Sequence, residues 1–218
     1  MTRMIAMGVD AATSRHAIKL AHAHDGVWAA VGHHPTEPSE PVFPLPIDPK
    51  VVAIGEVGLD FGRSEVRREE QLERFDRLCS QAVELDLPVS IHNRGATTEV
   101  AGLIRSHPGL RGVMHYFALG WDDAQTFLEL GFYLSFAGLI TRPSRNELRD
   151  VVKRCPPDRL LLETDSPYGN SHQRMGIQNR PAYLIDTAEK VAELRGMTVN
   201  EVGELETRNA LALFTRMR

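Results

Sequence analysis

The sequence predicts an α/β protein, specifically a (β/α)8 TIM barrel of parallel strands. Short apolar runs alternate with amphipathic helical stretches, as expected for parallel strands joined by right-handed crossovers. Metal-binding residue types, Glu56, His92, His115 and Asp165, stand at the ends of four separate runs. A barrel gathers the carboxyl ends of its strands at one rim, whereas the alternative, an open doubly wound sheet, concentrates its site at one switch point.

The strand candidates are one fewer than an eight-stranded barrel contains. The chain begins almost inside the first candidate, so we expect the absent strand and its helix to precede residue 1. The candidates are RMIAMGV (3–9), VWAAVGH (27–33), VVAIGEV (51–57), LPVSIHN (87–93), RGVMHYF (111–117), FYLSFAG (132–138) and RLLLETD (159–165).

Helix signals fill most of the intervals between these runs. Ser64 is predicted to cap a helix that runs through Asp86, and a further helix is predicted to end near Gly196. Two Ser/Thr-x-x-Glu sequences have the spacing of a capping box. These are Ser144 with Glu147 and Thr198 with Glu201. The proline-rich segment 35–49 is predicted to be a loop, and residues 1–218 to form a single domain.

The composition is that of an ordinary globular protein, with 42% hydrophobic and 25% charged residues. No apolar stretch has the length of a membrane span or of a signal-peptide core, so we expect a cytoplasmic protein without a membrane partner. Two cysteines distant in sequence fit a reducing compartment. The net charge of −4 argues against tight non-specific binding of nucleic acid, but it does not exclude a local phosphate site.

Carboxylate and imidazole side chains are ligands of divalent metals. Four of them at strand ends are hard to explain by packing alone, although a structural role is the alternative. His22 and His24 have a His-x-His spacing but fall at the end of a predicted helix. Residues two apart on a helix project to opposite sides, so we interpret this pair as surface histidines.

Four motifs strongly resemble those of the TatD family of metal-dependent hydrolases. They are GEVGLD (55–60), IHNR (91–94), HYF (115–117) and ETDSPY (163–168), with further similarity in GHHP (32–35), NRPAYL (179–184) and NALALF (209–214). The resemblance covers nearly the whole chain in the family's order. It implies a barrel of the amidohydrolase-like group. It also implies a divalent-metal-dependent deoxyribonuclease, because members of the family generally have this activity and some act from 3′ ends.

The resemblance also implies a set of metal ligands. Glu56 corresponds to the glutamate that bridges two metals, His92 and His115 to the histidines that hold one of them, and Asp165 to the carboxylate that holds the other. The family's His-x-His pair on the first strand has no counterpart here. We therefore expect either an incomplete chain or a shortened protein that binds one ion at most. We favour the first, because removing a strand from a barrel exposes two unpaired edges.

The chemistry expected is phosphodiester hydrolysis by a metal-activated water, with Glu56 and Asp165 as catalytic residues and Asp165 orienting or deprotonating the water. His34 and Arg94 are candidate phosphate contacts, although a loop hydrogen bond would also explain His34. Phe117 and Tyr168 are candidates to stack on bases, with packing in the wall of the site as the alternative.

We expect Mg²⁺ as the cofactor, with Mn²⁺ or Zn²⁺ as alternatives and one or two ions bound. The expected partner is nucleic acid, single-stranded DNA first and RNA second, and the expected state is a monomer. Two other functions stay open: a hydrolase of another ester or amide on the same scaffold, and an inactive binding protein.

Overall fold

The computed structural model describes residues 2–38, 45 and 48–217. The chain divides into two compact units, each described by itself below. Unit 1 comprises Met1–Val113 and Leu213–Arg218, and unit 2 comprises Met114–Ala212. Part of the predicted loop 35–49 lies outside the described residues, whereas all seven predicted strands lie within them and are confirmed.

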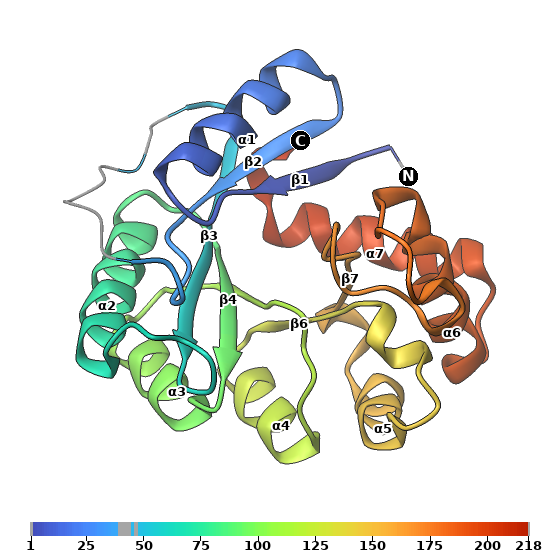
Figure 1. Ribbon diagram of the computed structural model, residues 1–218. Coiled ribbons are helices and arrows are strands. Elements are labelled where there is room, and N and C mark those ends of the chain that lie inside the picture. The colour runs from blue at the N-terminus through green and yellow to red at the C-terminus, as the bar shows by residue number, and fades with distance from the viewer. Residues whose placement is uncertain (1, 39–44, 46–47, 218) are drawn as a thin grey trace. The chain divides into compact units, whose positions relative to one another are not determined.

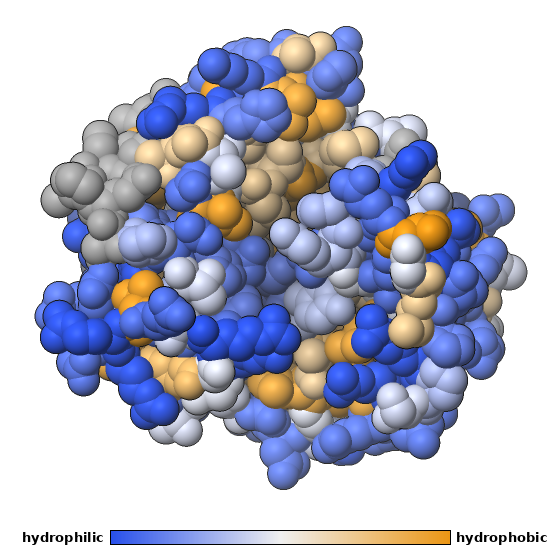
Figure 2. All heavy atoms as spheres, viewed as in Figure 1, coloured by the Kyte–Doolittle hydropathy of each residue, from blue (hydrophilic) through white to orange (hydrophobic). Residues whose placement is uncertain are grey.

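Unit 1 alternates strands with helices, and its strands follow chain order along the sheet. The ladders β1–β2, β2–β3 and β3–β4 are all parallel. Helices α2 and α3 lie on the same side of β3 and β4, and the surface over these helices is largely hydrophilic (Figures 1 and 2). The elements are β1 (Met4–Met7), α1 (Ala11–Ala23), β2 (Val27–Val31), β3 (Val51–Asp60), α2 (Arg68–Glu84), β4 (Val89–Arg94), α3 (Thr97–Ser106), β5 (Gly112–Met114, at the boundary with unit 2) and η5 (Thr215–Met217).

Strand β3 is the centre of unit 1, and all ten of its residues are buried. A near-continuous apolar run is what a parallel strand covered on both faces requires. Gly58 has a φ of +133°, and a Cβ there would lie 2.0 Å from the carbonyl oxygen of His92 on β4. Only glycine therefore lets the two strands approach at this point, where both carry candidate site residues.

Unit 2 contains the remaining elements, and its β6–β7 ladder is also parallel. Glu206 and Asn209 of α7 hydrogen bond to the backbone at β7: the Glu206 carboxylate accepts from the Leu162 N–H, and the Asn209 amide donates to the Leu160 carbonyl. The elements are α4 (Trp121–Glu129), β6 (Tyr133–Phe136), η1 (Gly138–Thr141), α5 (Asn146–Arg154), η2 (Pro157–Arg159), β7 (Leu160–Leu162), η3 (His172–Arg174), η4 (Pro181–Tyr183), α6 (Leu184–Arg195) and α7 (Val199–Leu213).

The helix starts correct two predictions. Ser64 does not cap α2, which begins at Arg68; its hydroxyl instead donates to the carbonyl of Pro35. The Ser144 and Glu147 pair forms no capping box, because α5 begins after Arg145 without a side-chain cap. In both cases the serine lies in the loop before the helix and does not cap it. A serine shortly before a helical stretch does not decide by itself whether its hydroxyl caps the helix.

The other end signals are confirmed. The Thr198 hydroxyl accepts from the Glu201 N–H, and the Glu201 carboxylate accepts from the Thr198 N–H, which completes a capping box. Helix α6 ends at Gly196, whose φ is +65°. His22 lies on α1 and its Nε2 is 3.0 Å from an Asp48 carboxylate oxygen, so the surface interpretation of His22 fits.

None of the helices in the described part of the chain is long and apolar enough to cross a membrane.

Candidate metal centre

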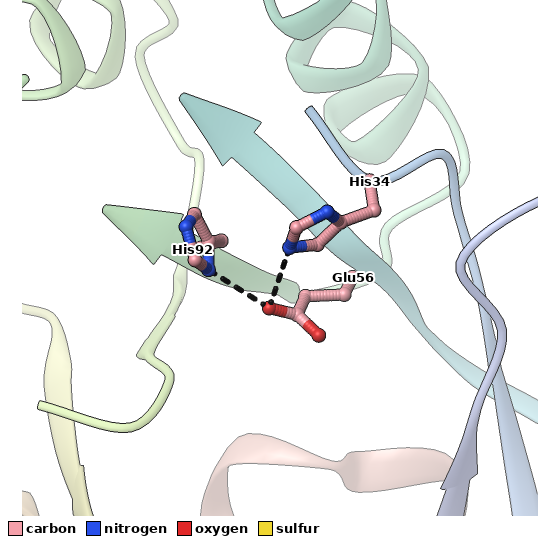
Figure 3. Close-up of side chains that lie close together, drawn as sticks. All are labelled: His34, Glu56 and His92. Atoms are coloured by element: carbon pink, nitrogen blue, oxygen red, sulfur yellow. Dashed lines mark hydrogen bonds and ion pairs between the residues drawn. The ribbon is translucent and has the colours of Figure 1, made fainter. Parts of the chain in front are cut away.

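Two imidazoles of unit 1 contact the same carboxylate oxygen, which belongs to Glu56. His34 Nε2 lies 3.3 Å from Glu56 Oε1, and His92 Nδ1 lies 3.2 Å from the same oxygen. Both imidazoles point toward this oxygen, and their rings meet edge to face with centroids 4.5 Å apart (Figure 3). One nitrogen from each imidazole and one carboxylate oxygen lie within 4.8 Å of one another.

Backbone hydrogen bonds fix the main-chain positions of Glu56 and His34. The Glu56 N–H donates to the Gly8 carbonyl after β1, and the His34 N–H donates to the Val9 carbonyl. Glu56 lies within β3, and His92 lies near the carboxyl end of β4. The residues that follow β1 and β2 are thereby held against β3, which brings His34 to Glu56.

Two of the three spacings between these ligand atoms fit a divalent ion. Metal–ligand bonds of 2.0–2.2 Å place adjacent ligand atoms roughly 2.8–3.6 Å apart in octahedral or tetrahedral geometry. The two distances from Glu56 Oε1, 3.3 and 3.2 Å, match this range. Two imidazoles with one carboxylate, all mostly buried, are also a donor set that Zn²⁺ or Mn²⁺ accepts and that water can complete.

Each of the two imidazoles in this cluster uses its second nitrogen for a supporting contact. His34 Nδ1 lies 2.7 Å from the Thr36 hydroxyl, and His92 Nε2 lies 2.9 Å from Asp60 Oδ2. Asp60 is only 2% exposed. Burial raises the pKa of Asp60, but hydrogen bonds from Arg63, His92 and Gly62 outweigh it and hold the pKa below its ordinary value. Supporting contacts of this kind orient metal-binding histidines.

Unit 2 holds a second group of such residues, around His115. Its Nδ1 lies 3.0 Å from Glu163 Oε1, and its Nε2 lies 3.5 Å from Asp165 Oδ1. Glu163 Oε1 also accepts a hydrogen bond from the Tyr116 N–H. Glu163 thus supports the imidazole from one side, while the other ring nitrogen faces Asp165.

The backbone beside this group adopts an uncommon conformation twice. Tyr116 has a φ of +45° and Asp165 a φ of +59°, although neither is glycine. Left-handed residues other than glycine cost free energy and concentrate at functional sites. Burial and the neighbouring Asp165 carboxylate both raise the pKa of the Tyr116 phenol.

The remaining candidates are the proposed phosphate contact Arg94 and the two aromatic residues, which differ in exposure. Arg94 ends β4, where its carbonyl accepts from the Phe61 N–H. Phe117 is only 4% exposed and packs edge to face on Phe136, as the packing alternative predicts. Tyr168 is 74% exposed, which leaves its ring free to meet a ligand.

Reasoning from the sequence missed three contributions. His34 was a candidate phosphate contact, but the structure places it within the cluster of Glu56 and His92. Asp60 and Glu163 were not singled out, although each touches a predicted ligand. A spacing of two is the signal that could have found Glu163, because it lies two residues before Asp165 in the run 159–165 that the sequence predicts as a strand.

Comparisons with known proteins identify the family of this chain. The family model of TatD related DNases matches residues 1–215. The metal-dependent hydrolase YabD of Bacillus subtilis is 35% identical over 97% of this chain and 87% of its own length. The 3′-5′ ssDNA/RNA exonuclease TatD of Pantoea vagans is 35% identical over 98% of this chain and 88% of its own length.

Solved structures give the same result. The crystal structure of YJJV, a TatD homologue from Escherichia coli K12, superposes with a TM-score of 0.87 at 28% identity, covering 99% of this chain and 87% of that one. A TatD family hydrolase from Entamoeba histolytica gives 0.82 at 20% identity, covering 99% and 85%. The fold is therefore the TIM-barrel-like fold of metal-dependent hydrolases, as the sequence predicted. The chain belongs to the TatD family.

Proposed function

We propose that this protein is a divalent-metal-dependent nuclease that hydrolyses phosphodiester bonds of single-stranded DNA. The observation that carries the proposal is the convergence of His34 and His92 on Glu56 at metal-ligand spacing. Support for the substrate comes from the Pantoea vagans relative, which is named a 3′-5′ ssDNA/RNA exonuclease. RNA is accordingly the second substrate that we propose.

The proposed ligands are Glu56 and His92 in unit 1 and His115 and Asp165 in unit 2, with His34 close enough to Glu56 to act as a further ligand. A bound divalent ion would supply Lewis-acid activation of water and of the phosphoryl oxygen. The absence of the family's His-x-His strand stays a prediction.

Three residues of the chain have further proposed roles in the reaction. Glu56 holds both neighbouring imidazoles through one carboxylate oxygen and so fixes the geometry of the site. Asp165, 28% exposed at its side chain, is the proposed group that orients or deprotonates the attacking water. Arg94, at the end of the strand that carries His92, is the proposed phosphate contact.

Cleavage of a 3′-labelled single-stranded oligonucleotide tests this function. We expect cleavage with Mg²⁺ or Mn²⁺, none after EDTA treatment, and a loss of at least about 100-fold in kcat/KM for His115→Ala, because a ligand is removed. The circular dichroism and Tm of the variant should match those of the wild type.

The same assay with small ester and amide substrates separates the alternatives. Metal-dependent hydrolysis of those substrates without cleavage of DNA or RNA would overturn the nuclease and favour another hydrolase. Loss of all hydrolysis, with every metal tried, would favour a binding protein. We further propose Mg²⁺ as the metal, a monomeric single-domain barrel, and a cytoplasmic location.

A further inference from the structure

The two ring nitrogens of His92 face two different carboxylates. Nδ1 lies 3.2 Å from Glu56 Oε1, and Nε2 lies 2.9 Å from Asp60 Oδ2. A neutral imidazole carries one proton, so only one of these nitrogens can donate while the other keeps a lone pair. A metal requires that lone pair, and the identity of the protonated nitrogen therefore decides whether His92 can bind an ion through the atom beside Glu56.

Several features favour Asp60 as the acceptor of that proton. Its bond to His92 is the shorter of the two, and Asp60 is 2% exposed. Glu56 Oε1, by contrast, is shared between His92 and His34. Asp60 is also held rigidly, because its Oδ1 accepts from the backbone N–H groups of Gly62 and Arg63 at 3.0 and 2.7 Å.

We propose that Asp60 is a positioning residue that holds the proton of His92 on Nε2 and so keeps the Nδ1 lone pair directed at the metal position beside Glu56. The inference rests on the proposed metal binding for its functional meaning. The position of the His92 proton, however, can be measured in the protein without metal.

The other imidazoles show that this arrangement is particular to His92. Thr36 contacts His34 at Nδ1, and Glu163 contacts His115 at Nδ1 as well, so in both residues Nε2 is the nitrogen turned toward a candidate ligand. Only in His92, among these three, is Nε2 the supported nitrogen. In His34 and His115 the carboxylate beside Nε2 is a candidate ligand, whereas in His92 it is the supporting residue Asp60.

The substitution Asp60→Asn tests the proposal with almost no change in shape. The two backbone N–H groups of Gly62 and Arg63 need an acceptor, so the side-chain oxygen of the introduced asparagine would remain where Oδ1 of Asp60 is now. Its NH₂ group would then face His92 Nε2, and two donors cannot share that contact. His92 would have to move its proton to Nδ1 and lose the lone pair beside Glu56.

The readout is the ¹⁵N chemical shifts of the His92 ring in metal-free protein, at a pH where the imidazole is neutral. We expect the Nε2–H tautomer in the wild type and the Nδ1–H tautomer in Asp60→Asn. Titration with Mn²⁺ should then show roughly a 10- to 100-fold weaker Kd for the variant, which is the usual effect of losing such a support.

Asp76→Asn is the matched control, because Asp76 Oδ1 contacts His107 Nε2 at 2.8 Å, a pair that shares no residue with the cluster. It should leave the His92 tautomer and the Mn²⁺ affinity unchanged. An Nδ1–H tautomer in the wild type would overturn the proposal without any variant, even if Asp60→Asn failed to fold. So would an unchanged tautomer and Kd in a folded Asp60→Asn protein. Loss of nuclease activity alone bears on the proposed function and not on this inference.

Discussion

At the scale of single residues, the candidate site residues form two groups of three carboxylate and imidazole side chains in short contact. His34, Glu56 and His92 form one group, and His115, Glu163 and Asp165 form another. In each group a buried or half-buried supporting residue takes the ring nitrogen that faces away from the candidate ligands. This division of the two nitrogens suits a metal-binding histidine, because a fixed tautomer keeps the lone pair on the nitrogen that faces the metal position.

Tyr168 is the residue whose exposure most directly suggests contact with substrate. Its ring is 74% exposed, yet its backbone is fixed: the N–H donates to the Asp165 carbonyl, and the carbonyl accepts from the buried Asn179 side chain. An exposed ring on a fixed backbone, three residues after a proposed ligand, is suited to stacking on a base.

We predict that Tyr168→Ala raises KM for single-stranded DNA by roughly 5- to 150-fold, since stacking contributes about 1–3 kcal/mol per base. Steady-state kinetics would measure this, with Tyr168→Trp as the control that preserves an aromatic face. Hydrolysis of bis(p-nitrophenyl) phosphate should be unaffected by Tyr168→Ala. An equal loss on both substrates would show that Tyr168 supports the site itself and does not stack.

The sequence predicts residues of this kind only in part. Glu56, His92, His115 and Asp165 could be singled out because each ends a run with an obvious apolar pattern. Asp60 could not, because its importance depends on an imidazole contributed by another strand 32 residues later. Likewise, the burial of Phe117 and the exposure of Tyr168 follow from neighbours that no local pattern specifies.

At the scale of elements, polar side chains join α7 to β7 and to the turn before it. Asn209 is 3% exposed and donates to the carbonyls of Pro157 and Leu160. Glu206 accepts from the Leu162 N–H. Burial raises the pKa of the Glu206 carboxyl to about 8; the Leu162 N–H lowers it in part, and the nearby Glu163 raises it. These contacts hold the strand that directly precedes Glu163 and Asp165.

The raised pKa of Glu206 makes the stability of the fold depend on pH. Between its ordinary pKa of 4.5 and about 8, the folded state keeps a proton that the unfolded chain has released. Stability therefore falls as pH rises through this window, and it levels off above it. Glu206→Gln should remove this dependence, because the amide stays neutral and its oxygen can still accept from Leu162.

We predict that Glu206→Gln gains, relative to the wild type, on the order of 1 to 3 kcal/mol in free energy of unfolding between pH 5 and pH 8. The gain is smaller than the full value of the shift because the surface of Glu206 is only half-buried. Urea unfolding at several pH values measures it, with the exposed Glu204→Gln as the matched control. Parallel pH profiles for the Glu206→Gln variant and the wild type would show that this carboxyl is ionised in the folded protein at neutral pH.

Element ends were predictable where the local chemistry is self-contained. The Thr198 and Glu201 box and the left-handed Gly196 need no distant partner, and both are confirmed. Ser64 was predicted wrongly because the carbonyl of Pro35, 29 residues earlier, takes its hydroxyl. A local signal fails when tertiary structure supplies a competing partner.

At the scale of the whole molecule, the order of strands and helices could be predicted from alternation alone. All seven expected strands are present in the described part of the chain, and the fold matches the TatD structures. What alternation cannot supply is the register between strands, such as the pairing of Gly58 with His92 that lets β3 and β4 approach. Register decides which side chains meet, so the composition of the His34 cluster could not be predicted.

The claim that the His34, Glu56 and His92 cluster binds a divalent ion is tested most directly by calorimetric titration of the metal-free protein with Mn²⁺ and Mg²⁺. Because Glu56 contacts both imidazoles, we predict saturable binding by the wild type and a loss of at least about 10-fold in affinity for Glu56→Gln. The Glu204→Gln control should bind as the wild type does. Absence of binding to the wild-type protein, or equal affinities for wild type and Glu56→Gln, would contradict the metal centre.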